Sequence, residues 1–228
     1  MTFISRRDLL KRAAIVGAAA PLADVGRPFE GRQNDGEPDR LALHAHEMAA
    51  AREPLENLTA TEADLLEAIC ARLIPTDANG PGATEARAAH YIDRALGGAL
   101  APSRQAYTAG LAALDRYSRS SRGTPFTELS PIDQDSVLID VETGAATGFT
   151  GSSAVFFALV LSHTHQGTFG DPYYGGNANF IGWDLLGYPG IRTMVTAGEQ
   201  QQLEKHTLKP NHKSAYETDM FTKATGEA

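Results

Sequence analysis

Apolar residues recur at helical spacing through the middle of the chain, and the first such pattern is LTATEADLLEAICARLIP. Thr59 is followed three residues later by Glu62, which is the pattern of a capping box at a helix start. Pro75 ends the pattern because proline cannot continue a helix. The sequence therefore predicts a helix over 59–74. Its apolar positions are Leu65, Leu66, Ile69, Leu73 and Ile74.

Two more helices are predicted in the next forty residues. Residues 84–96 precede Gly97-Gly98, a glycine stop. Residues 103–117 place large apolar side chains on one side, as an amphipathic helix does. These side chains are Tyr107, Leu111, Leu114 and Tyr117.

A fourth helix is predicted over 131–142 from its start signals. Ser130 suits the cap, Pro131 the first helical position, and Asp133 adds an acid to the first turn. Its apolar positions are Val137, Leu138 and Val141.

The longest apolar run, 154–161, lies in SAVFFALVLSHTHQG. Valine and phenylalanine leave a strand open, but a cap at Ser152 or Ser153 and the length favour a buried central helix ending at Gly167. Strands paired by tight turns are not found in the sequence. We therefore predict an all-α fold, an irregular helical bundle with extended termini.

The segment FGDPYYGGNANFIGWDLLGYPG, residues 169–190, is called here the glycine-aromatic loop. It holds six glycines, six aromatic residues and the only tryptophan of the chain, Trp183. Glycine and proline prevent a continuous helix or strand, while so many aromatic rings argue against a disordered linker. Asp171-Pro172 suits a turn, and Gly175-Gly176-Asn177 tolerates positive φ. An ordered loop that holds rings in fixed positions is typical of an interface hot spot.

The first residues follow the order of a signal peptide: basic, then apolar, then small. In SRRDLLKRAAIVGAAAPLA, the pair Arg6 and Arg7 precedes an apolar run over 13–20, and paired arginines mark the twin-arginine export route. The run is shorter than the ~20 residues of an ordinary membrane span. We predict a twin-arginine signal over 1–23, cut after Ala23 or kept as an anchor. The alternative is a basic N-terminal helix.

Polar segments flank the predicted helical domain of residues 58–190. Residues 24–57 are expected to be a linker, rich at first in Gly, Pro and Asp, with a short helix over 41–52. Residues 191–228 contain few large apolar side chains, so this extension is expected to be disordered or laid on a partner.

Composition argues against several classes of partner and site. A net charge of -8, with no basic block after the first dozen residues, argues against a nucleic-acid partner. The single cysteine, Cys70, excludes an internal disulfide framework and any multi-cysteine metal site. Because it lies beside the apolar stripe of its helix, Cys70 is expected to be a buried, inert thiol.

His163, His165 and Asp171 are the candidates for chemistry. Residues two apart on a helix point in different directions, so the histidines lack the i, i+4 spacing of helical metal sites. A site using one of them with Asp171 stays open as an alternative to histidines that bond the helix end and order the loop. A triad with Ser162 is disfavoured because a nucleophile elbow is not found, and GGNANFIG lacks the pattern of a phosphate cradle.

The central helix and the loop together, FFALVLSHTHQGTFGDPYYGGNANFIGWDLLGYPG, resemble the gluconate 2-dehydrogenase subunit 3 family. Four earlier stretches resemble the family in the same order: LTATEADLLEAICARLIPTD, GATEARAAHYIDRAL, YTAGLAALDRYS and PFTELSPIDQDSVLIDVE. The resemblance covers 58–190, and the extension after Gly190 is longer than expected of the family core. It singles out signature positions, to which we assign partner contacts together with Tyr173: His163, Phe169, Gly170, Asp171, Pro172, Tyr174, Gly175, Gly176, Asn177 and Trp183.

The resemblance implies a non-catalytic small subunit of a periplasmic sugar or polyol dehydrogenase. In such complexes the catalytic partner is a glucose-methanol-choline-type flavoprotein that carries FAD, and a c-type cytochrome often takes the electrons. The small subunit supplies the twin-arginine signal and escorts its folded partner. This explains why a signal for folded cargo precedes a chain in which we predict no cofactor, metal or catalytic residue. A free periplasmic ligand-binding module is the third hypothesis.

Overall fold

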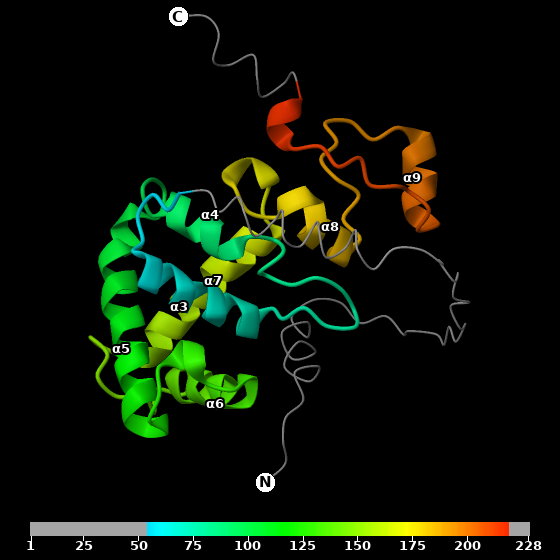
Figure 1. The fold of residues 1–228 in the computed structure, drawn as a ribbon. Coiled ribbons are helices and arrows are strands. Elements are labelled where there is room, and N and C mark those ends of the chain that lie inside the picture. The colour runs from blue at the N-terminus through cyan, green and yellow to red at the C-terminus, as the bar shows by residue number, and fades with distance from the viewer. Residues whose placement is uncertain (1–53, 219–228) are drawn as a thin grey trace, which may run out of the picture. The chain divides into compact units, whose positions relative to one another are not determined.

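The computed structural model describes residues 54–218, all within a unit that begins at Glu53. These residues form seven α-helices joined by loops and short 3₁₀ turns, and they contain no strand beyond one isolated bridge between Asp77 and Gly80 (Figure 1). The predicted all-α class is confirmed. The predicted signal, the helix over 41–52 and the end of the extension lie outside the described residues.

The first described helix, α3 (Ala60–Leu73), begins as its sequence predicts. The Thr59 hydroxyl accepts a hydrogen bond from the Glu62 N–H, and the Glu62 carboxylate accepts one from the Thr59 N–H, which completes a capping box. The chain entering this helix is held by Asp93, whose buried carboxylate accepts N–H groups from residues 56–58 at 2.7–3.0 Å.

Helix α4 (Ala88–Ala95) begins four residues later than predicted. Arg87 lies in the left-handed region with φ of 59°, so residues 84–87 form turns rather than helix. The Ala88 N–H donates to the Ala83 carbonyl at 2.9 Å, and both alanines are fully buried. Tight packing of small residues therefore sets this boundary.

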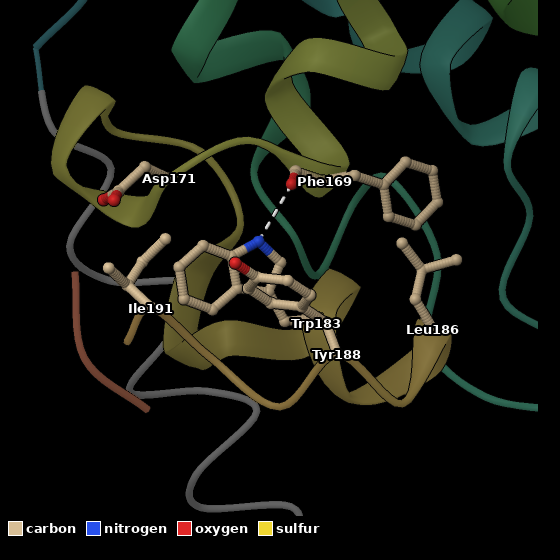
Figure 2. A pocket seen from close by; sticks show the side chains of 6 residues that line it. All are labelled: Phe169, Asp171, Trp183, Leu186, Tyr188 and Ile191. Carbon is tan, nitrogen blue, oxygen red and sulfur yellow. Dashed lines mark hydrogen bonds between the residues drawn. The ribbon is translucent and has the colours of Figure 1, made fainter. Parts of the chain in front are cut away.

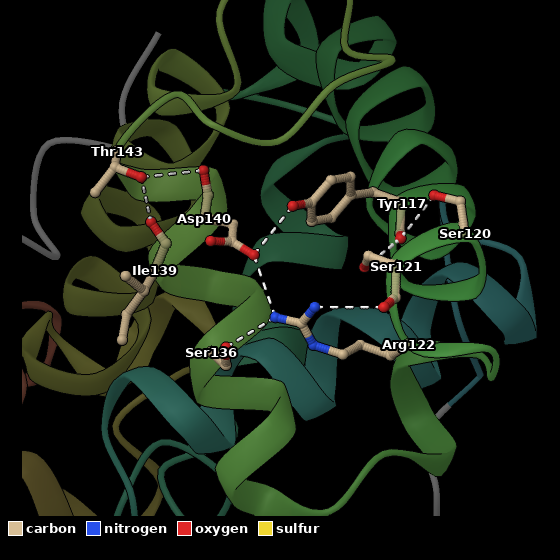
Figure 3. Close-up of polar contacts among 8 residues, drawn as sticks. All are labelled: Tyr117, Ser120, Ser121, Arg122, Ser136, Ile139, Asp140 and Thr143. Atoms are coloured by element: carbon tan, nitrogen blue, oxygen red, sulfur yellow. Dashed lines mark hydrogen bonds and ion pairs between the residues drawn. The ribbon is translucent and has the colours of Figure 1, made fainter.

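Helices α5 (Arg104–Arg122) and α6 (Pro131–Glu142) pack against each other. Helix α5 runs five residues beyond the predicted end, to Arg122, and is capped by Gly123 with φ of 85°. Helix α6 has the predicted bounds and the predicted Ser130 cap. Asp140 on α6 accepts from the Tyr117 hydroxyl at 3.0 Å and from Arg122 at 3.3 Å, which ties the two helices together (Figure 3).

Helix α7 (Ser153–Phe169) is the predicted central helix and contacts α3, α4, α5, α6 and α8. Ser152 is the N-cap residue, one of the two predicted positions, but its side chain makes no capping hydrogen bond. The Ser153 hydroxyl donates to the Val141 carbonyl at 2.9 Å. The predicted stop at Gly167 is wrong. Gly167 lies within the helix instead of ending it. A Cβ on Gly167 would lie 2.9 Å from the Ala88 Cα, so glycine at this position allows α4 and α7 to pack closely against each other.

The glycine-aromatic loop follows α7 and contains two 3₁₀ turns and the short helix α8 (Ile181–Leu186). Residues 191–218, called here the C-terminal arm, contain α9 (Ala197–Glu204) (Figure 1). No residue of α9 is buried. Across residues 54–218, no helix combines the length and apolar character needed to cross a bilayer.

Candidate functional site in the glycine-aromatic loop

Asn177 fixes the path of the loop from inside. Its side chain is fully buried, and its backbone has φ of 43°. The side-chain amide donates to the Gly170 carbonyl at 2.8 Å and accepts from the Gly182 N–H at 2.7 Å, while its own N–H donates to the Gly167 carbonyl at 2.7 Å. One residue thus joins the end of α7 to both halves of the loop.

Two glycines let the loop lie directly on the last turn of α7. A Cβ on Gly176 would lie 2.2 Å from the Gly167 carbonyl oxygen, and one on Gly182 would lie 1.9 Å from the Thr168 carbonyl oxygen. Of Gly175, Gly176 and Asn177, which all tolerate positive φ, Gly175 and Asn177 adopt it. At Gly176 close backbone approach, rather than positive φ, is what requires glycine.

Trp183, within the loop, has a buried side chain, with 5% of its surface exposed. Its indole N–H donates to the Phe169 carbonyl at 2.9 Å, and its ring packs against Tyr188 with centroids 4.9 Å apart. Beside it lies a pocket of about 270 Å³ (Figure 2). Six residues line this pocket: Phe169, Asp171, Trp183, Leu186, Tyr188 and Ile191.

Asp171 uses both carboxylate oxygens to order backbone. Oδ1 accepts from the Tyr173 N–H at 3.0 Å and so caps the 3₁₀ turn Pro172–Tyr174, which confirms the predicted turn. Oδ2 accepts from the Ala215 N–H at 2.8 Å. The carboxylate therefore fastens the C-terminal arm to the loop.

Three tyrosines gather where the arm meets the loop. Tyr216 of the arm stacks on Tyr173 with centroids 3.9 Å apart, and its hydroxyl lies 2.6 Å from that of Tyr174. The hydrogen bond to Tyr216 raises the pKa of the Tyr174 phenol above its usual value. Tyr173 and Tyr174 are nevertheless 58% and 49% exposed. The cluster thus presents rigid aromatic surface to solvent.

The candidate histidines are not brought together with Asp171. His163 is buried in the core, where its Nδ1 lies 2.9 Å from the Tyr107 hydroxyl, and burial lowers its pKa. The expectation that it bonds the helix end is wrong for His163, while the exposed ring of His165 lies 6.2 Å from that of Phe169 at the loop start. Among residues 54–218, no three His, Cys, Asp or Glu side chains are grouped to hold a metal ion.

Cys70 is buried as predicted, with its Sγ 3.4 Å from the Thr164 hydroxyl. Burial raises the pKa of its thiol to about 12, so the reactive thiolate is suppressed at neutral pH. The prediction that Cys70 is buried is confirmed.

The predicted partner-contact residues divide by exposure. His163, Gly176, Asn177 and Trp183 are buried and support the loop from inside. Phe169, Gly170, Asp171, Pro172 and Gly175 are partly buried, and Tyr173 and Tyr174 are exposed. A direct partner contact stays a prediction for all of them, and it requires the least rearrangement at the two tyrosines.

Sequence reasoning missed the residues that the arm contributes. Neither Tyr216 nor His212 is marked by the spacing or composition of the extension. His212 stacks on Phe180 with centroids 5.1 Å apart, and its Nε2 lies 2.7 Å from Asp184 Oδ1. These contacts join residues 28 to 44 positions apart, and no local pattern marks such pairs.

Comparison with known proteins gives one match. The model of a protein family described as gluconate 2-dehydrogenase subunit 3 matches residues 60–190, which is more than half of the chain. No curated protein and no solved structure matches. The matched region begins at the first residue of α3 and ends with the glycine-aromatic loop.

Proposed function

Because the chain belongs to the gluconate 2-dehydrogenase subunit 3 family, we propose that it is the accessory small subunit of an FAD-dependent sugar or polyol dehydrogenase. The family is one of subunits of a dehydrogenase complex, which implies a catalytic partner subunit. In our proposal that partner is a glucose-methanol-choline-type flavoprotein that holds the FAD. The small subunit binds it, stabilises its folded state and escorts it through twin-arginine export to the periplasm.

The preorganised aromatic surface of the loop is the observation that carries this proposal. Tyr173 and Tyr174 are exposed, yet their backbone is held by the Asp171 cap and by the buried Asn177. Rigid tyrosines lose little conformational entropy on binding and supply large contact areas, as interface hot spots do. A partner protein is therefore the ligand that this surface suits.

A non-catalytic role fits how the candidate acid-base groups are used. Both oxygens of Asp171 accept backbone N–H groups, and the His163 ring nitrogen lies within hydrogen-bond distance of a buried tyrosine. These side chains hold backbone and core in place. We find no observation that favours an enzyme with its own site at His163, His165 and Asp171.

Export is the second part of the proposal and rests on the sequence. Arg6 and Arg7 stand in a twin-arginine context, and that route carries folded proteins. A flavoprotein without its own signal would cross the membrane bound to this chain. A c-type cytochrome that accepts the electrons is the further partner that we expect.

Purification of the tagged, exported protein tests the proposal. We expect a larger chain to co-elute in stoichiometric amount and the eluate to show the visible absorption of flavin. Expression of the same flavoprotein without the small subunit should leave it less stable and in the cytoplasm, since binding stabilises the folded state by mass action. Equal periplasmic dehydrogenase activity with and without this chain would refute the escort role.

A further inference from the structure

The C-terminal arm lies beyond the region matched by the family, which ends at residue 190. Near its C-terminal end, the arm is nevertheless fastened to the glycine-aromatic loop, which lies within the matched region. The Ala215 N–H bonds Asp171, Tyr216 stacks on Tyr173, and His212 stacks on Phe180. The arm is therefore positioned next to the surface that we assign to partner binding.

Helix α9 precedes these anchors in the chain and buries none of its side chains. Isolated helices shorter than about 12 residues are marginal in water, and most helices in proteins are stabilised by packing of one face. Apolar side chains beside and on α9 are instead exposed: Met194 by 78%, Val195 by 50% and Leu203 by 38%. This part of the arm lacks the packing that would stabilise it within its own chain.

Exposed apolar side chains concentrate around the arm. Among the described residues, nine of the thirteen large exposed apolar side chains lie in the last part, between Tyr173 and Tyr216. The pocket opens among them, next to Leu186, which is 63% exposed. Its volume of about 270 Å³ lies below the usual range for small-molecule sites, roughly 300–1,000 Å³, and suits a single bulky side chain.

The arm also differs in charge from the body of the domain. Residues 54–190 carry 7 basic and 15 acidic side chains, whereas the arm carries 4 basic and 3 acidic ones. No acidic residue occurs between Glu204 and Glu217, a stretch in which Lys205, Lys209 and Lys213 are all exposed. A partner surface that complements this stretch is acidic.

We propose that the arm and the adjoining pocket form a second docking site for the catalytic subunit. That subunit inserts one bulky apolar side chain into the pocket beside Leu186 and places carboxylates opposite Lys205, Lys209 and Lys213. Charge pairing of this kind steers association and selects the partner. The inference rests on the proposed function, because it takes the flavoprotein as the occupant.

Charge reversal tests the electrostatic half with the purified, flavin-containing catalytic subunit as the probe. The K205E/K209E/K213E variant should bind it roughly tenfold more weakly than the natural chain at low salt, with a smaller dependence on salt concentration. Arg116→Glu on α5 is the matched control for each single reversal, K205E, K209E or K213E, because Arg116 is an exposed basic residue outside the arm and loop. It should bind nearly as the natural chain does.

The apolar half is tested by Leu186→Glu, with Ile132→Glu on α6 as the control. Both side chains are exposed, by 63% and 80%, so neither change should unfold the protein. Leu186→Glu should weaken binding by roughly tenfold or more, while Ile132→Glu should not. If the natural chain binds the flavoprotein and all variants bind equally well, the second docking site is overturned.

Two further outcomes also contradict the inference, for different reasons. If the natural chain itself fails to bind the purified flavoprotein, the proposed function fails and this inference with it. If the chain alone forms a dimer that Leu186→Glu dissociates while flavoprotein binding is unchanged, the site serves a second copy of the chain instead.

Discussion

Asn177 shows how one side chain can replace regular secondary structure. It satisfies the Gly170 carbonyl and the Gly182 N–H, two backbone groups that face the interior of the loop. Buried backbone groups without partners cost free energy, so the loop can stay ordered only if something supplies these bonds.

Replacement of Asn177 by Ala should lower the free energy of unfolding by about 2–4 kcal/mol, because two buried groups lose their partner. Urea unfolding followed by Trp183 fluorescence measures this loss, since Trp183 is the only tryptophan and is buried within the loop. Asn179→Ala is the matched control: Asn179 also has positive φ, 55°, but its side chain is exposed. An equal loss in both variants would assign the effect to backbone strain rather than to the hydrogen bonds.

Burial of His163 predicts how stability depends on pH. Its pKa in the folded protein lies below the ordinary value of 6.5, so the unfolded chain takes up the proton first as the pH falls. The free energy of unfolding should therefore be highest above about pH 6.5 and decrease below it, by at most about 1.4 kcal/mol per pH unit for one proton.

His163→Gln removes this titration and keeps a hydrogen-bond acceptor for Tyr107. Its free energy of unfolding, measured in urea between about pH 5 and pH 8, should fall less steeply on acidification than that of the natural chain. His165→Gln should flatten the curve in the same direction, because burial lowers the pKa of His165 as well. Parallel curves for His163→Gln and the natural chain would contradict the assignment.

At the scale of elements, close contacts through glycine decide how the helices pack around α7. A Cβ on Gly110 of α5 would lie 2.2 Å from the ring of Phe156 on α7. That ring is 8% exposed and also contacts Tyr107 and Phe149, so it has little room to move. The close packing of α5 and α7 at this point therefore requires glycine at position 110, because any side chain there would overlap the ring of Phe156.

Gly110→Ala should lower the free energy of unfolding by about 1–3 kcal/mol, although alanine favours helix more than glycine does. Thermal unfolding followed by circular dichroism measures the change. Gly198→Ala in α9 is the matched control, because nothing lies within 4 Å of its added Cβ. It should be neutral or stabilising by up to about 1 kcal/mol. A stabilised Gly110→Ala protein would show that α5 and α7 separate without cost.

Helix ends separate into those that local chemistry predicts and those that it does not. The capping box at Thr59 and the Ser130-Pro131 start were predicted correctly, because the groups that cap a helix lie within three residues of its end. The start of α4 and the end of α7 were not. Both depend on contacts of Ala88 and Gly167 with each other's helices.

At the scale of the whole molecule, export should depend on the twin-arginine signal, whereas assembly with the flavoprotein should not depend on it. Replacement of Arg6 and Arg7 by Lys should leave complex formation intact and keep both this chain and the flavoprotein in the cytoplasm. Dehydrogenase activity in periplasmic and cytoplasmic fractions measures this, with Arg12→Lys as the control. Unchanged periplasmic activity in the double variant would show that the partner crosses by another route.

The helical class, the positions of five helices, the family resemblance and the importance of the glycine-aromatic loop all follow from the order of residues. They depend on spacing, capping and composition, which act over a few positions and are visible in one dimension. Which loop residues face inward could not be predicted in this way. Asn177 and Trp183 are buried while Tyr173 and Tyr174 are exposed, although all four stand in one polar and aromatic stretch.

The tertiary structure also decided where the C-terminal arm packs. Its sequence left disorder and binding to a partner open, yet Ala215 and Tyr216 contact the chain's own loop. The bond from Ala215 to Asp171 spans 44 residues, and closing such a separation leaves no periodic trace in the sequence. Only the folded path of α7 and the loop brings the two residues together.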